Sequence, residues 1–393
     1  MTSRPTIIIL LGAYWPGHES TGPNLSILAM CESLSNRFDF KIVARDRPFS
    51  GGKAVGVVGQ WHLTDYASLR YLQVGPLGAL GLTNLLRSTQ HDLLVMNGFF
   101  DREFTLPCLI SRRLGVLPEV ATLLSPRGEL TGGALSLKSG RKAFYRNWAN
   151  RLDLHKGVHL HATSEFELAD CQSALPANNC WLAPNFRSLF PLPMRVARPE
   201  GAPLRLMFLG RITEVKRLDF ALRAIAASRV RVCLSIYGPL SDESYWRRCS
   251  AVIAELPGDS TAELHGEISN ADVPNVLAAH DALLLPSLSE NFGHAIFESL
   301  ASGTPVIIGD RTPWRGLQSM RAGFDLPVDD LEAFASAIRQ LAALSEDALQ
   351  EWRRGARAKV TTYLRDSQAQ ETMVALFERL IAQRLAPVNN HTR

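Results

Sequence analysis

The chain has 393 residues, of which 46% are hydrophobic, and a formal net charge of +4. This length favours two domains with ordinary buried cores, and no stretch reaches the ~20 apolar residues that a membrane-spanning helix needs. The six cysteines form no Cys-x-x-Cys pair and stand beside no histidine cluster, so neither a disulfide framework nor a zinc site is expected. The apolar run 7–11 is too short for a secretion signal and reads as a first strand, which predicts a cytoplasmic protein.

The basic excess lies in the first half of the chain. Residues 1–190 carry 19 Lys and Arg against 14 Asp and Glu, whereas the remainder carries 23 against 24. This asymmetry favours an anionic partner for the first half, such as a phosphate or a membrane surface. The excess is too small to indicate nucleic acid, and no nucleic-acid-binding motif is visible.

Short apolar runs alternate with amphipathic stretches through the first half. The predicted strands cover residues 6–11, 40–44, 93–96, 120–124, 158–162 and 180–183, and the predicted helices cover 24–34, 104–114, 140–153 and 165–174. This alternation is typical of a parallel sheet with helices on both faces.

Residues 184–203 contain five prolines, which cannot continue a helix or a central strand. We therefore expect a linker there, with an N-terminal domain over residues 1–190 and a C-terminal domain over 204–366. Strands are predicted at 204–209, 230–237, 262–264, 282–285 and 305–308, and helices at 294–302, 331–344, 346–363 and 368–384. The predicted fold class is α/β, with two Rossmann-like parallel-sheet domains.

The stretch 283–307, LLLPSLSENFGHAIFESLASGTPVI, has the order strand, loop, helix, strand of a βαβ unit. Ligands collect beyond the carboxyl ends of parallel strands. Gly293 allows close backbone approach, and the helix start after it attracts phosphate. Glu290 and Glu298, on the order of 10 Å apart along the helix, would accept hydrogen bonds from hydroxyls on either side. This suits a nucleotide sugar, although a solvated helix with two surface glutamates explains the spacing equally well.

A second candidate feature follows the strand 204–209. Arg211 and Lys216 come just after it, and since parallel strand ends share one edge, both are expected near the Gly293 helix start. Two cations there would neutralise a diphosphate. Asp219 is predicted to cap the next helix. The alternative is a basic surface loop.

The residues of the first feature closely resemble the signature of family-4 glycosyltransferases, which are retaining enzymes of the GT-B fold. The matching positions are Glu290, Asn291, Phe292, Gly293, Glu298, Ala301, Gly303, Pro305 and Val306. The resemblance implies that Glu298 holds the ribose hydroxyls. It also implies that Glu290 contacts the transferred sugar, helped by the amides of residues 291–293.

Arg211 and Lys216 resemble the family's diphosphate-binding Arg and Lys, but Arg217 stands where Gly is usual. Gly238, after the strand 230–237, resembles a glycine that lines the nucleotide. Gly22 resembles the second glycine of a pair near the sugar phosphate. It lies in the Gly- and Pro-rich loop 12–23, where His18 and Glu19 are candidate acceptor contacts. A loop without ligand contacts is equally consistent.

Ser125-Pro126-Arg127-Gly128 resembles a subgroup with Ser-Pro-(His or Arg)-Gly. Many relatives have a sugar-contacting His at the position of Arg127. Arg127 is therefore expected to act in catalysis by holding phosphate, with pairing to Glu129 or another acid as the alternative. Smaller resemblances lie at 162–165, 184–185 and 312–314.

Lys138, Arg141, Lys142 and Arg146 are interleaved with aromatic residues and have no acid between them. A basic amphipathic helix with aromatics suits an anionic membrane surface, as a polyprenyl-diphosphate acceptor would require. The alternative is a solvated face with a buried aromatic stripe.

The resemblance implies two domains facing across a cleft, with the last helix, in residues 367–393, packed back on the first. It implies retaining transfer of a hexosyl unit from a UDP- or GDP-linked donor to a saccharide or lipid-linked saccharide, without metal or cofactor. The expected setting is bacterial surface polysaccharide synthesis at the inner face of the membrane. Two alternatives stay open: a sugar phosphorylase or synthase on the same scaffold, and a nucleotide-sugar-binding protein without turnover. A NAD dehydrogenase is disfavoured because residues 75–81, GPLGALG, follow no clear strand.

Overall fold

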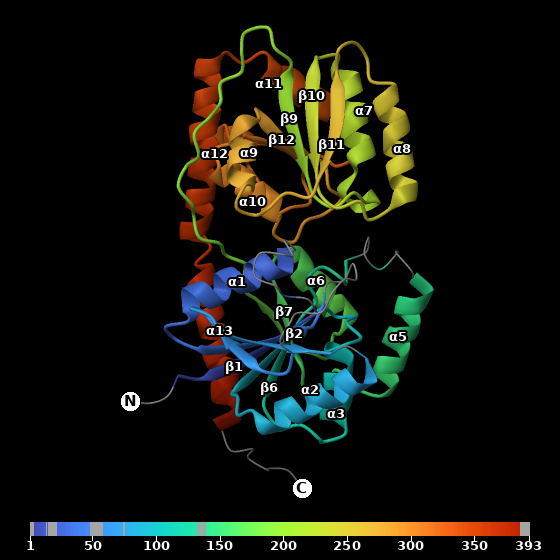
Figure 1. Cartoon of the computed structure of the whole chain (residues 1–393), viewed down its shortest axis with the longest axis vertical. Coiled ribbons are helices and arrows are strands. Elements are labelled where there is room, and N and C mark those ends of the chain that lie inside the picture. Colours follow the sequence, from blue (N-terminus) through green and yellow to red (C-terminus); the bar gives the residue numbers. More distant parts are fainter. Residues whose placement is uncertain are drawn as a thin grey trace. The chain divides into compact units, whose positions relative to one another are not determined.

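The computed structural model describes residues 4–12, 14, 22–47, 58–73, 75–131, 135 and 139–385. The chain forms two compact units (Figure 1). The first comprises Met1–Arg187 and Gln368–Arg393, and the second comprises Ser188–Ser367. The proline-rich segment from Ser188 onward is thus part of the second unit.

The first unit is built on an eight-stranded sheet. Its spatial order is β3 (Trp61–Leu63), β4 (Ser68–Leu72), β2 (Asp39–Arg45), β1 (Thr6–Leu11), β5 (Leu93–Asn97), β6 (Ala121–Ser125), β7 (His159–Ala162) and β8 (Cys180–Leu182). Neighbouring strands are parallel except for β3, which runs antiparallel to β4. The predicted parallel sheet is confirmed in its central strands, whereas β3 and β4 were not expected.

The residues around GPLGALG correct one expectation. β4 ends at Leu72 and helix α2 (Pro76–Ser88) begins directly after Gly75, so a strand does precede this segment. At Gly78 an added Cβ would lie 1.9 Å from the carbonyl oxygen of Gln73. This glycine therefore serves the close packing of the turn before the helix.

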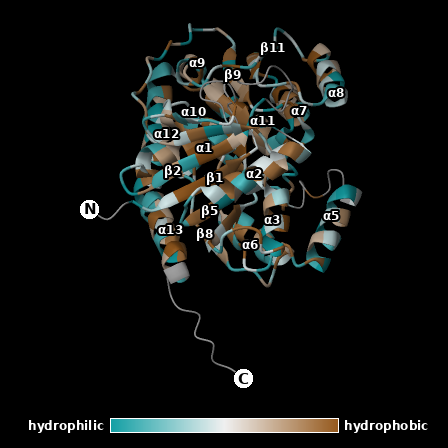
Figure 2. Ribbon diagram, turned by 60° about the horizontal axis from the view of Figure 1, so that its bottom comes forward, coloured by the Kyte–Doolittle hydropathy of each residue, from teal (hydrophilic) through white to brown (hydrophobic). Residues whose placement is uncertain are grey.

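Helices cover both faces of this sheet because its strands are apolar on both sides. Successive residues of β1 alternate between two cores, with Ile7 and Ile9 in one and Ile8 and Leu10 in the other; most of the strand is coloured hydrophobic in Figure 2. The helices are α1 (Gly22–Leu34), α2, α3 (Thr105–Arg113), α5 (Ser139–Arg151), α6 (Glu165–Ala174) and α13 (Ala369–Leu385).

Helix α13 belongs to the first unit although it comes last in the sequence. Its residues Met373, Phe377 and Leu380 are buried in the same core as Ile7 and Ile9, and the Phe377 ring meets that of Phe38 edge-on, with ring centroids 5.6 Å apart. The C-terminal segment thus completes one face of the N-terminal sheet.

The second unit contains a six-stranded, wholly parallel sheet. Its order is β11 (Thr261–Gly266), β10 (Val232–Tyr237), β9 (Leu204–Leu209), β12 (Ala282–Leu285), β13 (Val306–Gly309) and β14 (Gly323–Leu326). Its helical elements are η1 (Glu214–Lys216), α7 (Leu218–Ser228), α8 (Glu243–Ala254), α9 (Val273–Ala279), α10 (His294–Ala301), η2 (Gln318–Met320), α11 (Leu331–Ala342) and α12 (Glu346–Asp366).

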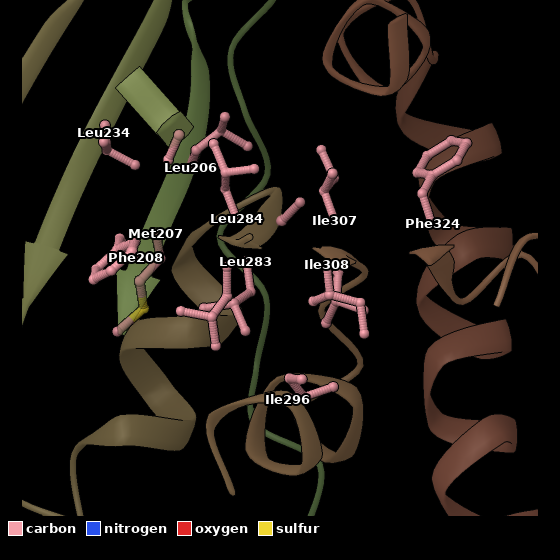
Figure 3. Close-up of a cluster of buried hydrophobic side chains, with 14 of the residues drawn as sticks. Leu206, Met207, Phe208, Leu234, Leu283, Leu284, Ile296, Ile307, Ile308 and Phe324 are labelled. Atoms are coloured by element: carbon pink, nitrogen blue, oxygen red, sulfur yellow. The ribbon is translucent and has the colours of Figure 1, made fainter. Parts of the chain in front are cut away.

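The core of this unit positions helix α10. Ile296 of α10 lies beneath Leu283 of β12 and Ile308 of β13 (Figure 3), and all three side chains are fully buried. This packing holds the helix against the central strands, so its first turn lies at the carboxyl edge of the sheet.

Candidate functional site

Two loops meet where β9 and β12 end, because these strands are neighbours in the sheet. The ammonium of Lys216 donates a hydrogen bond to the carboxylate of Glu290, which also accepts one from the Ser287 hydroxyl at 2.7 Å. The Leu288 amide donates to the carbonyl of Val215 at 2.9 Å, joining the same loops through the backbone. The structure thus brings Lys216 and Glu290 into direct contact, with side chains only 20% and 11% exposed.

The segment from Asn291 to Gly293 leads into α10. Gly293 precedes the helix with φ +75°, and a Cβ there would come within 2.8 Å of Ile296. Phe292 is buried, and its carbonyl accepts a hydrogen bond from the indole of Trp314. The first amides of a helix have no partner within it, so this buried anchoring presents an ordered anion-binding start to α10.

The remaining donor-side candidates lie around this helix start and the end of β9. Arg211 is exposed and makes no hydrogen bond or ion pair within the described part of the chain. Asn291 is half-buried, and Glu298, on α10, is 6% exposed. Among the described residues, Arg211 is thus a cation without an ion-pair partner, whereas Lys216 is already paired.

Gly238 ends β10 with φ +138°. Its amide donates to the carbonyl of Gly266 at 2.7 Å, and a Cβ on it would lie 2.0 Å from the carbonyl oxygen of Gly210. Because Arg211 follows Gly210, the bare backbone at Gly238 sets the path of the chain into the basic loop.

Arg217, at the position where the resembled family is expected to have glycine, adopts a backbone conformation that suits glycine. Its φ is +56°, in the left-handed region that favours glycine. Its guanidinium donates to the Val328 carbonyl and to Asp329, 3.0 Å away, and lies over the Phe220 ring at 4.1 Å. The Arg217 charge therefore anchors the loop.

The expectation that Asp219 caps α7 is wrong. The helix begins at Leu218 after the left-handed Arg217, which places Asp219 inside the first turn. Its carboxylate instead accepts from the Tyr245 hydroxyl at 2.6 Å and from Arg223 at 2.7 Å. It joins α7 to α8 rather than capping a helix.

In the first unit, His18, Glu19 and Lys138 lie outside the described residues. Gly22 is the first residue of α1, and its carbonyl accepts a hydrogen bond from the Ser26 hydroxyl at 3.1 Å. The structure thus places Gly22 at a helix start.

Arg127 lies just beyond β6 with φ +56°. Its guanidinium donates to the amide oxygens of Asn97 at 2.9 Å and Asn185 at 3.1 Å, and burial lowers its pKa to about 10. The alternative of pairing with Glu129 is wrong, because that carboxylate accepts from the Phe100 amide at 2.8 Å. Arg127 is therefore a half-buried cation whose hydrogen bonds go to neutral amide oxygens, with the charge of Glu167 nearby.

Glu167 is a positioning residue that the sequence reasoning missed. It is 1% exposed, and its carboxylate accepts from the Gly128 amide at 2.7 Å and from the Thr163 amide and hydroxyl. The signal was available, since Ser164 and Glu167 have the Ser-x-x-Glu spacing of a helix start, and Ser164 does cap α6. Glu167 thus fixes the loop that carries Arg127.

His161 lies beneath that loop in one defined neutral form. Its Nε2 lies 2.8 Å from the Ala183 carbonyl, which can only accept, so Nε2 carries the proton and Nδ1 accepts from the Ser125 hydroxyl at 2.8 Å. Burial, with the Arg127 charge second, lowers the pKa of His161 to about 3.

This arrangement predicts that the first unit loses stability in mild acid. Between about pH 3 and 6.5, His161 is protonated in the unfolded state but neutral in the folded state. The free energy of unfolding therefore falls as the pH drops through this window. From pH 7 to pH 4.5 the loss from His161 is expected to be roughly 2–3 kcal/mol. Urea unfolding at both pH values measures it.

Substitution of His161 checks this assignment. His161→Gln is expected to flatten the pH dependence, although burial also lowers the pKa of His155, to about 4, and that contribution remains. Equal pH slopes in wild type and His161→Gln would contradict the assignment.

Helix α5 exposes its aromatic residues. Phe144 is 74% and Trp148 36% exposed, so the alternative of a buried aromatic stripe is wrong for both. Lys142 lies over the Phe100 ring at 5.2 Å. Arg141 is exposed and Arg146 half-exposed. The described part of α5 therefore presents cations and aromatic rings to solvent together.

None of the helices in the described ranges combines the length and apolar character that crossing a bilayer requires. In the same ranges, no three His, Cys, Asp or Glu side chains are grouped so as to hold a metal ion.

Comparison with known proteins shows a match between part of this chain and one family model. Residues 203–343 match the family model of "Glycosyl transferases group 1". The chain is 26% identical over 176 residues to WcaL of Salmonella typhimurium, which is named as a colanic acid biosynthesis glycosyltransferase. That match covers 42% of this chain and 43% of WcaL, so the chain spans less than half the length of this curated relative.

Two solved structures are similar over nearly the whole chain. Sucrose-phosphate synthase from Thermosynechococcus elongatus has a TM-score of 0.73 at 18% identity and covers 97% of this chain and 100% of its own. HepE of Anabaena, solved with UDP and glucose, has a TM-score of 0.62 at 15% identity and covers 97% and 99%. The chain therefore has the GT-B fold of two parallel-sheet α/β domains, and its residues 203–343 are similar to the group 1 glycosyl transferases.

Proposed function

We propose that the protein is a retaining, metal-independent glycosyltransferase. It moves a hexosyl unit from a UDP- or GDP-linked sugar to a saccharide or lipid-linked saccharide acceptor. The observation that carries the proposal is the contact of Lys216 and Glu290 beside the Gly293-led start of α10. The family match over residues 203–343 supports sugar transfer, and the UDP and glucose bound by HepE support a nucleotide-sugar donor.

The charge of each donor-side residue determines which part of the donor it binds. Arg211, Lys216 and the amides at the start of α10 stabilise the negative charge that grows on the departing diphosphate. Glu290 accepts hydrogen bonds from the transferred sugar, and Glu298 accepts them from the ribose hydroxyls. In the structure Glu290 balances the charge of Lys216, so an incoming phosphate takes over part of that pairing.

The chemical step needs no protein nucleophile. The bond between the anomeric carbon and the diphosphate oxygen breaks, and the acceptor oxygen bonds to that carbon on the same face. The proton of the acceptor hydroxyl passes to a diphosphate oxygen. In the first unit, Arg127 adds a half-buried positive charge held by Asn97 and Asn185.

The setting we infer is surface polysaccharide synthesis at the inner face of a membrane. WcaL, the curated relative named for colanic acid synthesis, supports the pathway type. The exposed Phe144 and Trp148 beside Arg141 and Arg146 on α5 support contact with an anionic lipid surface.

A nucleotide screen tests the proposal. A ligand at a hundred times its dissociation constant stabilises the folded state by about 2.7 kcal/mol, so UDP or GDP is expected to raise the melting temperature measurably, with ADP as the comparison. The matching sugar nucleotide should then release its nucleoside diphosphate only when an acceptor saccharide is added. Absence of any shift with all three nucleotides would contradict a donor site. Production of a sugar phosphate from saccharide and free phosphate would instead identify a phosphorylase.

A further inference from the structure

A cavity of about 590 Å³ lies in the second unit between α12 and the segment around residues 192–195. One wall is a single face of α12, formed by side chains at helical spacing. They are Gln350, Arg353, Arg354, Arg357, Ala358, Thr361 and Thr362. The opposite wall is formed by Leu192, Pro193 and Arg195, and Gly303 closes the end. The volume is in the range of small-ligand sites, roughly 300–1,000 Å³.

The lining contains four arginines and no acidic residue. Arg353 is 7% exposed; its guanidinium donates only to neutral oxygens, of Ser302 at 3.2 Å and Thr304 at 3.4 Å. Arg357 likewise donates to the main-chain carbonyls of Ala301 and Phe190. Both guanidiniums thus keep their full charge at the cavity, because neutral oxygens satisfy donors without cancelling charge.

The acids behind the cavity are shared among several arginines. Asp281 pairs with Arg195 at 3.1 Å, Arg198 at 3.3 Å and Arg205 at 3.1 Å, and Glu346 pairs with Arg195 at 2.7 Å. The Arg195 side chain is 7% exposed, and its Nη1 is buried without a hydrogen-bond partner in the described part of the chain. The four arginines of the lining, together with Arg198 and Arg205 behind it, therefore share only two carboxylates, those of Asp281 and Glu346.

This excess of positive charge destabilises the folded state unless a bound anion neutralises part of it. Burial, followed by the neighbouring Arg195 charge, lowers the pKa of Arg353 to about 10. Arg354 is exposed and makes no hydrogen bond or ion pair with any described residue. Guanidinium forks match phosphate geometry in two simultaneous hydrogen bonds, and the hydroxyls of Thr361 and Thr362 add neutral donors.

We propose that this cavity binds a small soluble phosphate-bearing molecule, with Arg353, Arg354 and Arg357 on its phosphate. The cavity is separate from the candidate donor site, since Gly293 precedes α10 and Gly303 follows it, and a helix of eight residues spans about 12 Å. The inference is independent of the proposed sugar transfer. Leu192, Pro193 and Ala358 provide the apolar contacts for the carbon skeleton of the ligand.

The test is calorimetric titration of the full chain with inorganic phosphate and with glucose 6-phosphate. Arg354→Gln removes an exposed cation that the fold does not use and should weaken binding about tenfold. Ala358→Glu places a carboxylate in the cavity from an exposed helical position and should abolish binding. Arg365→Gln, at an exposed position of the same helix that does not line the cavity, is the matched control and should bind as wild type does.

Arg211→Ala separates the two anion sites. Binding that persists in Arg211→Ala and disappears in Ala358→Glu supports the proposal. Absence of binding to the wild type would overturn it, as would equal binding by the wild type and Ala358→Glu, or loss in Arg211→Ala alone. If Ala358→Glu does not fold, as judged by circular dichroism, Arg354→Gln decides. Sugar transfer by Ala358→Glu should continue, so failure here is distinct from failure of the proposed function.

Discussion

Arg211→Ala and Lys216→Ala are each expected to lower kcat/KM for sugar transfer by roughly 10²–10³-fold. Removing one preorganised group that stabilises developing negative charge has a cost of this size. The loss should fall mainly on kcat, because charge on the diphosphate is largest when its bond to the sugar is breaking. Initial rates with the nucleotide sugar found in the screen measure the effect.

Stability measurements distinguish this loss from unfolding. Arg211 is exposed and makes no hydrogen bond or ion pair with a described residue, so Arg211→Ala should melt as wild type does. Lys216→Ala leaves Glu290 with only the Ser287 hydroxyl of its two side-chain partners, so a small loss of stability is expected there. Arg223→Ala, which removes an exposed cation of α7 paired with Asp219, is the matched control and should retain activity. Wild-type kcat/KM in both site variants would refute the proposed roles.

Gly238→Ala is expected to destabilise the second unit by more than about 3 kcal/mol or to prevent its folding. The new Cβ would lie 2.0 Å from the carbonyl oxygen of Gly210 and 2.6 Å from its carbonyl carbon. Both are backbone atoms of the neighbouring strand end, which cannot move without disturbing the pairing of β9 with β10. The φ of +138° adds backbone strain for any residue with a side chain. Urea unfolding measures the loss.

Gly258→Ala provides the matched comparison. Gly258 also has a positive φ, +65°, but no atom lies within 4 Å of the position of its Cβ. This variant carries the backbone strain without the collision and should lose only about 1 kcal/mol. Equal losses in the two variants would show that the close approach of Gly238 to Gly210 is not what requires glycine.

The central elements could be predicted because burial leaves a plain pattern in the sequence. β12 is a continuous apolar run and β9 is apolar except for Arg205. The observed bounds of both strands match the prediction, and α10 begins at His294 as expected. The strands at the edges of the sheets were harder to predict. β3 has three residues, one of which, Leu63, is 85% exposed, and β14 has four. A short, half-exposed strand has no apolar run and is held by its neighbours, which a local pattern does not show.

In the candidate site, too, some contacts could be predicted from the sequence and others could not. The meeting of Lys216 and Glu290 follows from sheet order alone, because loops after neighbouring parallel strands share an edge. The partners of Arg127 do not follow from any local pattern, since Asn97 and Asn185 lie 30 and 58 residues away along the chain. The alternative of pairing with Glu129 is wrong because that carboxylate, although close in the sequence, accepts a hydrogen bond from the Phe100 amide in another loop.

The position of α13 also fixes an order of events during synthesis. Five residues of this helix complete one face of the N-terminal sheet: Ala369, Met373, Leu376, Phe377 and Leu380. While the chain is still on the ribosome, the part of that face beneath α13 stays uncovered until α13 emerges, although Ser188–Ser367 can already close its own core. The second unit is therefore expected to complete its folding first. Until α13 emerges, the first unit exposes an apolar surface to which chaperones can bind.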